Sequence, residues 1–383
     1  MVEEDKHEKN VKKKLLIATD CFLPRWDGIT RFLTQLLPAL QESFSITIIA
    51  PDFPGKMPEL EGVNIIRFPI INIQLGDISF SNFHYFAVKK IMREHDILFT
   101  QTIGPIGISA VLAGKRLKKP IISYIHSIEW ELTTKSIGKF KHLINVMTKM
   151  LARFIYRKCD LLLMPFPELK ELFIKNGIHT KSKIIFLGTD TAHFRPTHNK
   201  EEAKQKLGLK KDTFVIGFVG RLAREKNIIT LYRAFRIIEK KHENIRLLIV
   251  GKGIKDLEDE FRSDRNIIMA GATDNVLQYL QAMDIYVLPS LTETTSLSTV
   301  EAMACGIPVV TTPVGYVKYY VLEKYNGMLF PFRNSLVLSL KLDQLLKSHE
   351  LREKLGKHAR ETAVKRFSLD KMTKDIVETL ERY

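Results

Sequence analysis

Two carboxylates flank a predicted turn between a strand and a helix in the second half of the chain. Glu293 and Glu301 stand eight positions apart. The apolar run 284–289 before them predicts a buried strand, and 302–305 predicts a helix that ends before Gly306. Backbone N–H groups at a helix N-terminus suit a diphosphate, whereas carboxylates repel one and are useful only against hydroxyl groups. The turn therefore predicts a ligand that carries both phosphates and hydroxyls, such as a sugar nucleotide.

The residues between the two glutamates are small enough to let phosphates approach. Leu297 and Ser298 lie where the helix would begin, so their backbone N–H groups are candidate diphosphate donors. A structural interpretation stays open, in which Ser298 and Glu301 form a Ser-x-x-Glu capping box and Glu293 is a solvated loop residue.

A second candidate for phosphate binding follows the predicted strand 214–219. Gly220 allows a tight turn there, and Arg221 and Lys226 place two cations near a helix start. A guanidinium can hold phosphate oxygens bidentately while an ammonium acts as a point charge. The alternative is an exposed basic loop without a ligand.

The elements that must position these residues alternate along the chain. Short apolar runs predict six strands in the first half, at 14–19, 46–50, 63–68, 96–100, 121–126 and 161–165, and five in the second, at 214–219, 245–250, 266–270, 284–288 and 307–311. Helical patterns separate them, which predicts parallel sheets with crossover helices. A length of 383 residues is long for one core. We expect two Rossmann-like domains, 1–195 and 196–369, with a ligand cleft between them and a final helix at 370–383.

The motif resembles the E-x7-E signature of family-4 retaining glycosyltransferases, the glycosyl transferases group 1. The tail Ala-Met-Ala-Cys-Gly-Ile-Pro-Val-Val and the earlier Gly-Arg-x-x-x-Glu-Lys loop share this resemblance. It implies the GT-B fold, two Rossmann-like doubly wound domains facing a central cleft, with the last helix packing back on the first domain. It also implies that Glu293 faces the donor sugar, Glu301 holds the ribose, and Arg221 and Lys226 bind the diphosphate.

The same resemblance assigns further residues. Gly251 and Thr273, in turns after two predicted strands, would approach the nucleotide. Gly28 would let a loop of the first domain come close to the donor phosphate. His126 would contact the donor sugar, and Glu129 would belong to the acceptor side. A structural or solvated histidine stays open, and no third ligand accompanies His126 and Glu129, so we expect no metal site.

The activity implied is a nucleotide-sugar-dependent hexosyltransferase, with a UDP- or GDP-sugar as co-substrate and no required cofactor. Thr294-Thr-Ser296 replaces the Gly-Phe-Gly that is common after the first glutamate in this family, and similar variants among lipid-directed members favour a glycolipid or glycan precursor as acceptor. The alternatives are a nucleotide-sugar epimerase or hydrolase of the same fold and a basic nucleic-acid-binding protein. No nucleic-acid motif is present, so we expect no nucleic acid partner.

A basic, amphipathic segment of the first half is a candidate for contact with a membrane surface. The net charge is +16, and the stretch 135–158 holds seven Lys or Arg residues and no acid. On a helical wheel the cations form one stripe and apolar side chains another, which suits an anionic membrane surface. The alternative is that the apolar stripe packs on the sheet.

The apolar runs, the first residues and the cysteines of the sequence indicate a cytoplasmic protein. The inner membrane surface is a candidate place for it to act. No apolar run reaches the ~18 residues that span a bilayer, and the first residues are charged. Cys21, Cys159 and Cys305 are odd in number and widely spaced, so we expect reduced thiols.

Overall fold

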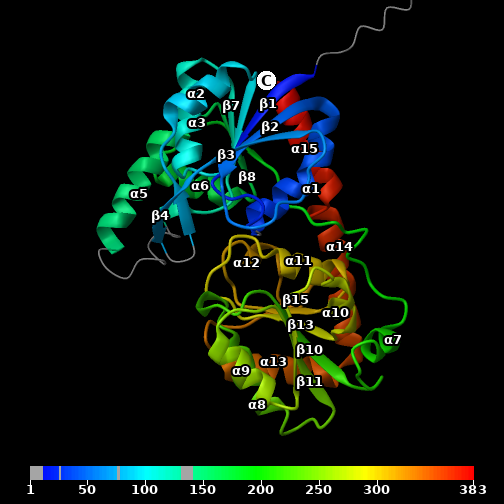
Figure 1. The fold of residues 1–383 in the computed structure, drawn as a ribbon. Coiled ribbons are helices and arrows are strands. Elements are labelled where there is room, and N and C mark those ends of the chain that lie inside the picture. Colours follow the sequence, from blue (N-terminus) through cyan, green and yellow to red (C-terminus); the bar gives the residue numbers. More distant parts are fainter. Residues whose placement is uncertain (1–11, 26, 76–77, 131–140) are drawn as a thin grey trace, which may run out of the picture. The chain divides into compact units, whose positions relative to one another are not determined.

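The computed structural model describes residues 12–25, 27–75, 78–130 and 141–383. The chain forms two compact units: unit 1 runs to Phe186 and includes Thr373–Tyr383, and unit 2 is Leu187–Met372. The boundary between the units therefore lies before the 195/196 boundary expected from the sequence. Figure 1 shows both units, and each is described here by itself.

Unit 1 is built on a parallel sheet with strand order β3-β2-β1-β6-β7-β8-β9. Its strands are β1 (Lys13–Ala18), β2 (Phe44–Pro51), β3 (Val63–Phe68), β6 (Ile97–Thr100), β7 (Ile121–Tyr124), β8 (Leu161–Met164) and β9 (Ser182–Ile184). A separate antiparallel pair consists of β4 (Ile70–Leu75) and β5 (Ile78–Ser81). The strand order reverses between β1 and β6, and parallel sheets bind ligands beyond the carboxyl ends of the strands at such a point.

Helices cover both faces of this sheet. The described helices of unit 1 are α1 (Gly28–Ser43), α2 (Tyr85–Arg93), α3 (Pro105–Arg116), α5 (Lys141–Tyr156), α6 (Pro167–Lys175) and most of α15 (Leu369–Glu381), whose first four residues belong to unit 2. Figure 1 shows α1 and α15 on one side of the sheet and α2, α3 and α5 on the other. The last turns of α15 are fixed in unit 1, because Lys183 donates to Thr379 at 2.7 Å and Ser43 donates to Glu381 at 2.6 Å.

Unit 2 repeats the same design with strand order β12-β11-β10-β13-β14-β15. Its strands are β10 (Phe214–Val219), β11 (Ile245–Val250), β12 (Ile267–Gly271), β13 (Ile285–Leu288), β14 (Val309–Thr311) and β15 (Gly327–Leu329). Its helices are α7 (Lys200–Gln205), the 3₁₀ turn η1 (Arg224–Lys226), α8 (Ile228–Ile238), α9 (Lys255–Ser263), α10 (Leu277–Ala282), α11 (Leu297–Ala304), α12 (Val317–Tyr320), α13 (Ser335–Lys347) and α14 (His349–Arg366). The reversal of strand order lies between β10 and β13.

The sequence predicted this architecture correctly. All eleven expected strands exist, three with the expected bounds and the others with ends displaced by at most two residues, and they form two parallel sheets. The sequence did not predict β4, β5, β9 or β15. The central strands are apolar and buried on both faces because helices cover both sides, whereas the edge strands β3, β9 and β12 are only partly buried.

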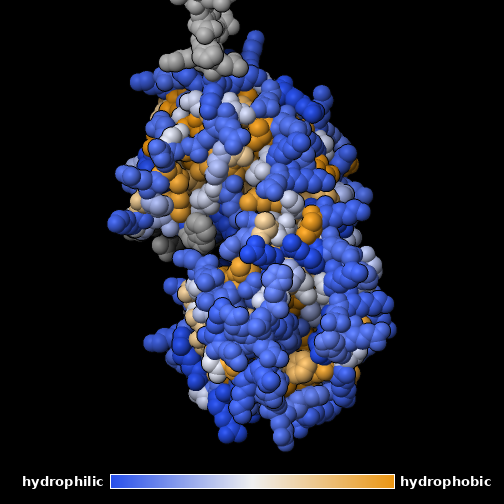
Figure 2. Space-filling view, turned by 90° about the vertical axis from the view of Figure 1, so that its right-hand side faces the viewer, coloured by the Kyte–Doolittle hydropathy of each residue, from blue (hydrophilic) through white to orange (hydrophobic). Residues whose placement is uncertain are grey.

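Surface features agree with a chain that packs its apolar residues inside. Hydrophilic side chains cover most of the face in Figure 2, with smaller hydrophobic patches between them. Of the helices that the structure describes, none combines the length and apolar character needed to span a bilayer. Cys159 and Cys305 are buried free thiols, and Cys21 is a half-buried one.

Candidate active site

The turn after β13 leads into α11, and its cap differs from the capping box that the sequence left open. Ser296 is the N-cap of α11, and its Oγ accepts a hydrogen bond from the backbone N–H of Thr299 at 3.4 Å. Ser298 lies inside the helix, and the hydroxyl of Tyr286 donates to its Oγ at 2.9 Å. The capping-box interpretation of Ser298 and Glu301 is therefore wrong. The first turn of α11 presents the backbone of Leu297 and Ser298 at its positive end.

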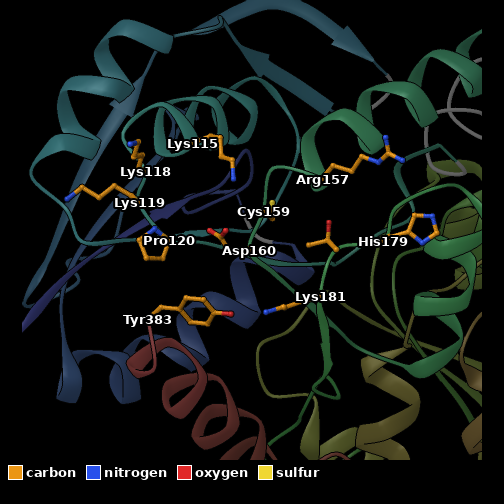
Figure 3. Close-up of a pocket in the computed structure, with 11 residues that line it drawn as sticks. Lys115, Lys118, Lys119, Pro120, Arg157, Cys159, Asp160, His179, Lys181 and Tyr383 are labelled. Atoms are coloured by element: carbon orange, nitrogen blue, oxygen red, sulfur yellow. The ribbon is translucent and has the colours of Figure 1, made fainter.

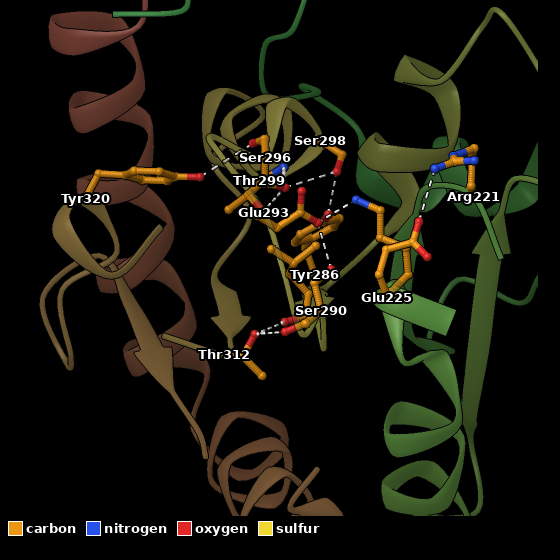
Figure 4. Close-up of polar contacts among 12 residues, drawn as sticks. Arg221, Glu225, Tyr286, Ser290, Glu293, Ser296, Ser298, Thr299, Thr312 and Tyr320 are labelled. Carbon is orange, nitrogen blue, oxygen red and sulfur yellow. Dashed lines mark hydrogen bonds and ion pairs between the residues drawn. The ribbon is translucent and has the colours of Figure 1, made fainter. Parts of the chain in front are cut away.

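Glu293 is held from two sides through one carboxylate oxygen. The Nζ of Lys226 lies 2.5 Å from its Oε1, and the Oγ of Ser290 donates to the same atom at 2.7 Å. The Glu293 side chain is only 10% exposed, so this ion pair is screened far less than a surface pair. Among the described residues no hydrogen bond ends on Oε2. Figure 4 shows Glu293 between the loop that carries Glu225 and the start of α11.

The loops after β10 and β13 are joined by the backbone as well. The N–H of Leu291 donates to the carbonyl of Glu225 at 2.7 Å. Asn227, in a left-handed conformation with φ of 50°, donates through Nδ2 to the carbonyl of Pro289 at 3.2 Å. The two loops flank the point where the strand order of unit 2 reverses, so the predicted phosphate loop and the predicted sugar-binding glutamate form one site.

Arg221 is placed differently from Lys226. Its side chain is exposed and forms an ion pair with Glu225 at 3.1 Å, one turn further along the same loop (Figure 4). Of the two predicted diphosphate cations, the structure brings Lys226 to Glu293 and leaves Arg221 at the solvent edge.

A third segment, after β14, supports the turn, and the sequence reasoning missed it. Gly315 has a φ of 50°, and a Cβ added there would lie 2.0 Å from the carbonyl oxygen of Glu293. Tyr316 donates its backbone N–H to the carbonyl of Thr294 at 3.0 Å, and the hydroxyl of Thr312 donates to the carbonyl of Ser290 at 2.6 Å. The available signal in the sequence was the glycine that ends the Thr312-Pro-Val-Gly315 segment after the strand.

Glu301 lies on the inner face of α11, 2% exposed. Burial raises the pKa of Tyr286, and the negative charges of Glu293 and Glu301 raise it further. Burial also raises the pKa of Cys305 to about 12, with the charge of Glu301 adding to the shift. Both glutamates of the motif therefore contribute to the raised pKa of Tyr286.

The other predicted nucleotide-binding residues have local roles. Gly251 has a φ of 139°, and a Cβ there would lie 2.0 Å from the carbonyl oxygen of Gly220, so it lets the loops after β10 and β11 approach each other. Thr273 is half-buried and accepts a hydrogen bond from the N–H of Asn275 at 3.1 Å.

His126 follows β7 in unit 1 and packs among aromatic rings. Its ring centroid lies 4.8 Å from that of Phe32 and 4.7 Å from that of Tyr124. Burial lowers the pKa of His126 to about 3, so the imidazole is neutral at neutral pH. Its Nε2 lies 2.9 Å from Oε1 of Gln101, an arrangement in which Nε2–H donates and Nδ1 is left as an acceptor.

Asp20 joins the loops after β1 and β6 and was not predicted from the sequence. It accepts hydrogen bonds from the N–H groups of Ile106 at 2.9 Å and Gly107 at 3.2 Å, at the start of α3, and from the hydroxyl of Thr102 at 2.5 Å. Burial raises its pKa, although these hydrogen bonds oppose the shift. These hydrogen bonds of Asp20 lie where the strand order of unit 1 reverses, between β1 and β6.

Gly28 is the first residue of α1, and a Cβ added there would meet no atom within 4 Å. Asp27 caps the helix by accepting from the N–H groups of Ile29 at 3.0 Å and Thr30 at 2.9 Å. Packing therefore does not require a glycine at position 28. Close approach of a ligand would be a reason for the glycine.

Glu129 is bound to α5 and not to His126. The hydroxyl of Tyr156 donates to its Oε1. Burial raises the pKa of Glu129 to about 7, and the hydrogen bond from Tyr156 opposes this shift. Within the described part of the chain, no group of three or more His, Cys, Asp or Glu side chains is arranged to hold a metal ion.

Two family models match successive parts of the chain. The model for glycosyl transferases group 1 matches residues 199–362, and that for glycosyltransferase family 4 matches residues 26–193. The chain is 25% identical to an alpha-monoglucosyldiacylglycerol synthase of Streptococcus pneumoniae, covering 92% of this chain and 85% of that protein. It is 28% identical to a UDP-Gal:alpha-D-GlcNAc-diphosphoundecaprenol alpha-1,3-galactosyltransferase of Escherichia coli, covering 84% and 85%.

Solved structures show the same fold. HepE of Anabaena, solved in complex with UDP, superposes with a TM-score of 0.77 at 18% identity, covering 97% of this chain and all of that one. WaaG, a glycosyltransferase involved in lipopolysaccharide biosynthesis, superposes with a TM-score of 0.74 at 17% identity, covering 96% and 99%. These neighbours have the GT-B fold, so the predicted fold class is confirmed.

The raised pKa of Glu129 predicts a pH dependence of stability. Its folded pKa of about 7 exceeds the ordinary 4.5, so the folded state keeps a proton that the unfolded state has lost between these values. Its contribution is fully present below pH 4.5 and is lost as the pH rises through 7. In the wild type, this effect lowers the free energy of unfolding by at most about 3 kcal/mol between pH 4.5 and pH 8. We expect this decrease to be absent in Glu129→Gln.

Urea unfolding at both pH values measures this difference. The control is Glu59→Gln, because Glu59 is an exposed glutamate of the same unit. An equal pH dependence in wild type and Glu129→Gln would contradict the assignment.

Proposed function

The chain belongs to the group 1 glycosyltransferases and has the GT-B fold, and from this premise we propose that it is a retaining enzyme acting on a membrane-bound acceptor. It is a nucleotide-sugar-dependent hexosyltransferase, and we infer a UDP- or GDP-sugar as donor and a glycolipid or glycan precursor as acceptor. The observation that carries the proposal is the Lys226–Glu293 ion pair, which joins the phosphate loop and the sugar-binding glutamate in one site.

The ion pair solves an electrostatic conflict in donor binding. A carboxylate close to a diphosphate is repelled by it, but Lys226 at 2.5 Å neutralises Glu293 on one oxygen. Lys226 and the exposed Arg221 then attract the phosphates, and the N–H groups of Leu297 and Ser298 add the positive end of α11. As the bond to the sugar breaks, negative charge grows on the diphosphate and positive charge on the sugar, and these groups stabilise both.

The remaining residues have proposed roles on the nucleotide and in unit 1. Glu301 accepts from the ribose hydroxyls, with Gly251 and Thr273 nearer the base. In unit 1, the acceptor Nδ1 of neutral His126 suits a sugar hydroxyl, and Gly28 suits a close approach of phosphate. Glu129 belongs to the acceptor side. The division into a donor-binding region at 196–369 and an acceptor-side region at 1–195 is part of this proposal.

Relatives support a lipid-linked acceptor. The S. pneumoniae relative is by name a glycolipid synthase, and the E. coli relative acts on a diphosphoundecaprenol-linked sugar. Unit 1 of this chain carries a surface that suits such an acceptor, on helix α5.

The exposed face of α5 is apolar. Its side chains are 40–64% exposed, and the stripe consists of Leu143, Val146, Met147, Met150, Leu151 and Phe154. The buried face of the same helix carries Ala152, Ile155 and Tyr156, so the alternative that the apolar stripe packs on the sheet is wrong. Residues 135–140 of the predicted basic stretch lie outside the described residues.

We propose that this stripe contacts an anionic membrane surface. Lys149 and Lys158 border it, while Arg153 and Arg157 donate to carbonyls at the end of α6 at 2.9 and 3.0 Å. Phe86, on α2, is 85% exposed and adds an aromatic side chain on the same side of the sheet (Figure 1). Cations beside an apolar helix face attract the anionic lipids of the cytoplasmic leaflet, and this attraction supports the proposal that the enzyme acts at that surface.

The direct test of the function is transfer with defined stereochemistry. Incubation with a panel of UDP- and GDP-sugars and lipid acceptors is expected to give product only when acceptor is present, with the anomeric configuration of the donor retained. The coupling constant of the anomeric proton in the NMR spectrum of the product measures this. An inverted product would end the retaining proposal, and release of free sugar or an epimerised donor without acceptor would favour the hydrolase or epimerase alternatives.

The two glutamates are expected to separate turnover from nucleotide binding. Glu293→Gln should lower kcat by about 10²–10³-fold, because it removes a charge that acts on the sugar. Its affinity for the nucleoside diphosphate should be unchanged or higher, since Lys226 is released toward the phosphates. Glu301→Gln should weaken that affinity about tenfold or more through the loss of charge-assisted hydrogen bonds.

Calorimetry with the nucleoside diphosphate and initial-rate assays measure the two effects. Glu243→Gln, at an exposed position of unit 2, is the control. Normal turnover in Glu293→Gln would remove it from the site, and normal nucleotide affinity in Glu301→Gln would remove its role at the ribose.

The α5 stripe is expected to be needed for membrane binding but not for folding. The variant Met147→Ser, Met150→Ser, Phe154→Ser replaces side chains that are 60%, 64% and 54% exposed, so little buried contact is lost. It should lose most of its sedimentation with anionic liposomes. The matched control Phe332→Ser, Leu336→Ser, Leu340→Ser changes side chains of unit 2 that are 46%, 60% and 56% exposed and should sediment normally. Equal sedimentation of both variants, or none of wild type, would exclude this contact.

A further inference from the structure

An open basic pocket lies in unit 1, at the edge of the sheet opposite His126. It has a volume of about 930 Å³ and is lined by residues of the last turn of α3, three loops and the chain end (Figure 3). Pro120 immediately precedes β7, Asp160 precedes β8 and Lys181 precedes β9, so the pocket lies at the amino ends of these strands. His126 and Glu129 follow the carboxyl end of β7. The pocket is therefore separate from the residues assigned to sugar transfer.

Its charge is almost entirely positive. The cations that line it are Lys115, Lys118, Lys119, Arg157 and Lys181, with His179 beside them. The single side-chain carboxylate that lines it is that of Asp160, and it accepts a hydrogen bond from the N–H of Ile121 at 2.9 Å. Across the described parts of the chain, none of the five cations forms an ion pair. Cations gathered within a Debye length repel one another, and an anion in their midst removes this cost.

Helix dipoles account for only part of the cluster. Lys115 lies in the last turn of α3, where a cation is favoured, and Arg157 follows α5 and donates to the carbonyl of Gly177 at 3.0 Å. Lys118 has a left-handed φ of 56° just past the end of α3, where the N–H of Lys119 donates to the carbonyl of Gly114 at 3.0 Å, so its backbone ends that helix. Lys181 lies in the loop before β9, outside any helix. In Figure 3, Lys115 and Lys181 point into the pocket from different sides, and Lys118 lies at its rim.

We infer that this pocket binds a small anion that carries two or more phosphate charges. Its volume is in the range of small-molecule sites and leaves room for an organic group beside the phosphates, against the Tyr383 ring and Pro120. Five cations from one helix and three loops can surround such an anion, whereas a singly charged ion would leave most of the repulsion in place. The same chemistry is found in soluble pyrophosphates and in phosphate headgroups of lipids, and one experiment separates the two sources.

The experiment measures the reactivity of Lys115 in the full chain. An amine-acetylating reagent is applied with increasing inorganic pyrophosphate, sodium chloride holds the ionic strength constant, and mass spectrometry quantifies acetylation of Lys115. This readout reports the pocket alone, whatever binds in unit 2. We expect saturable protection in wild type and in the control Lys210→Gln, Lys240→Gln, which changes two exposed lysines of unit 2. In Lys118→Gln, Lys181→Gln, half-protection should need about tenfold more pyrophosphate.

A parallel titration uses dihexanoyl phosphatidic acid below its micellar concentration, so that no membrane surface is present for α5. Protection by this lipid and not by pyrophosphate assigns the site to a lipid headgroup, and protection by pyrophosphate assigns it to a soluble anion. The inference is overturned by absence of protection from both, by equal protection from sodium chloride alone, or by unchanged half-protection in Lys118→Gln, Lys181→Gln.

Discussion

The pair formed by Lys226 and Glu293 is the interaction on which the site of unit 2 depends. A carboxylate that is only 10% exposed costs several kcal/mol in lost hydration unless a countercharge and hydrogen bonds replace the water. Lys226 and Ser290 supply both on a single oxygen. The pair also ties two loops that are distant in sequence, because the strand order brings the ends of β10 and β13 together. The sheet thus decides which loops meet, and the ion pair fixes how they meet.

Backbone packing makes that geometry specific. Gly251 lets one neighbouring loop approach within 2.0 Å of where its Cβ would be, and Gly315 does the same against the backbone of Glu293. Substrate-binding side chains need such rigid support, because a small displacement of a charge changes its effect on a developing charge. In unit 1 a side chain gives the corresponding support, because Asp20 bridges the loops after β1 and β6 through its hydrogen bonds to Thr102 and to the start of α3.

The difference between what the sequence predicted and what it missed is physical. Buried parallel strands are continuous apolar runs, so eleven of them could be recognised, whereas β9 and β15 have three residues each and carry no pattern. The Glu293 and Lys226 loops were predicted by motif, but their contact was not, because it depends on strand order. Ser298 was a plausible N-cap by spacing, and Ser296 took that position two residues earlier. Asp20 and the contact between Glu129 and Tyr156 are products of tertiary packing, which spacing along the chain does not encode.

The excess of positive charge has no single explanation, because the cations occupy different electrostatic environments. Lys226 is neutralised within the protein and exposes its charge to a ligand only in part, whereas Arg221 shares an exposed ion pair with Glu225. Arg153 and Arg157 hold the end of α6. The lysines of the pocket at the amino ends of β7, β8 and β9, which are Lys115, Lys118, Lys119 and Lys181, form no ion pair with the described residues. A net charge of +16 would by itself suit any anionic partner. Unpaired lysines are concentrated at that pocket, and we infer that a bound anion neutralises them.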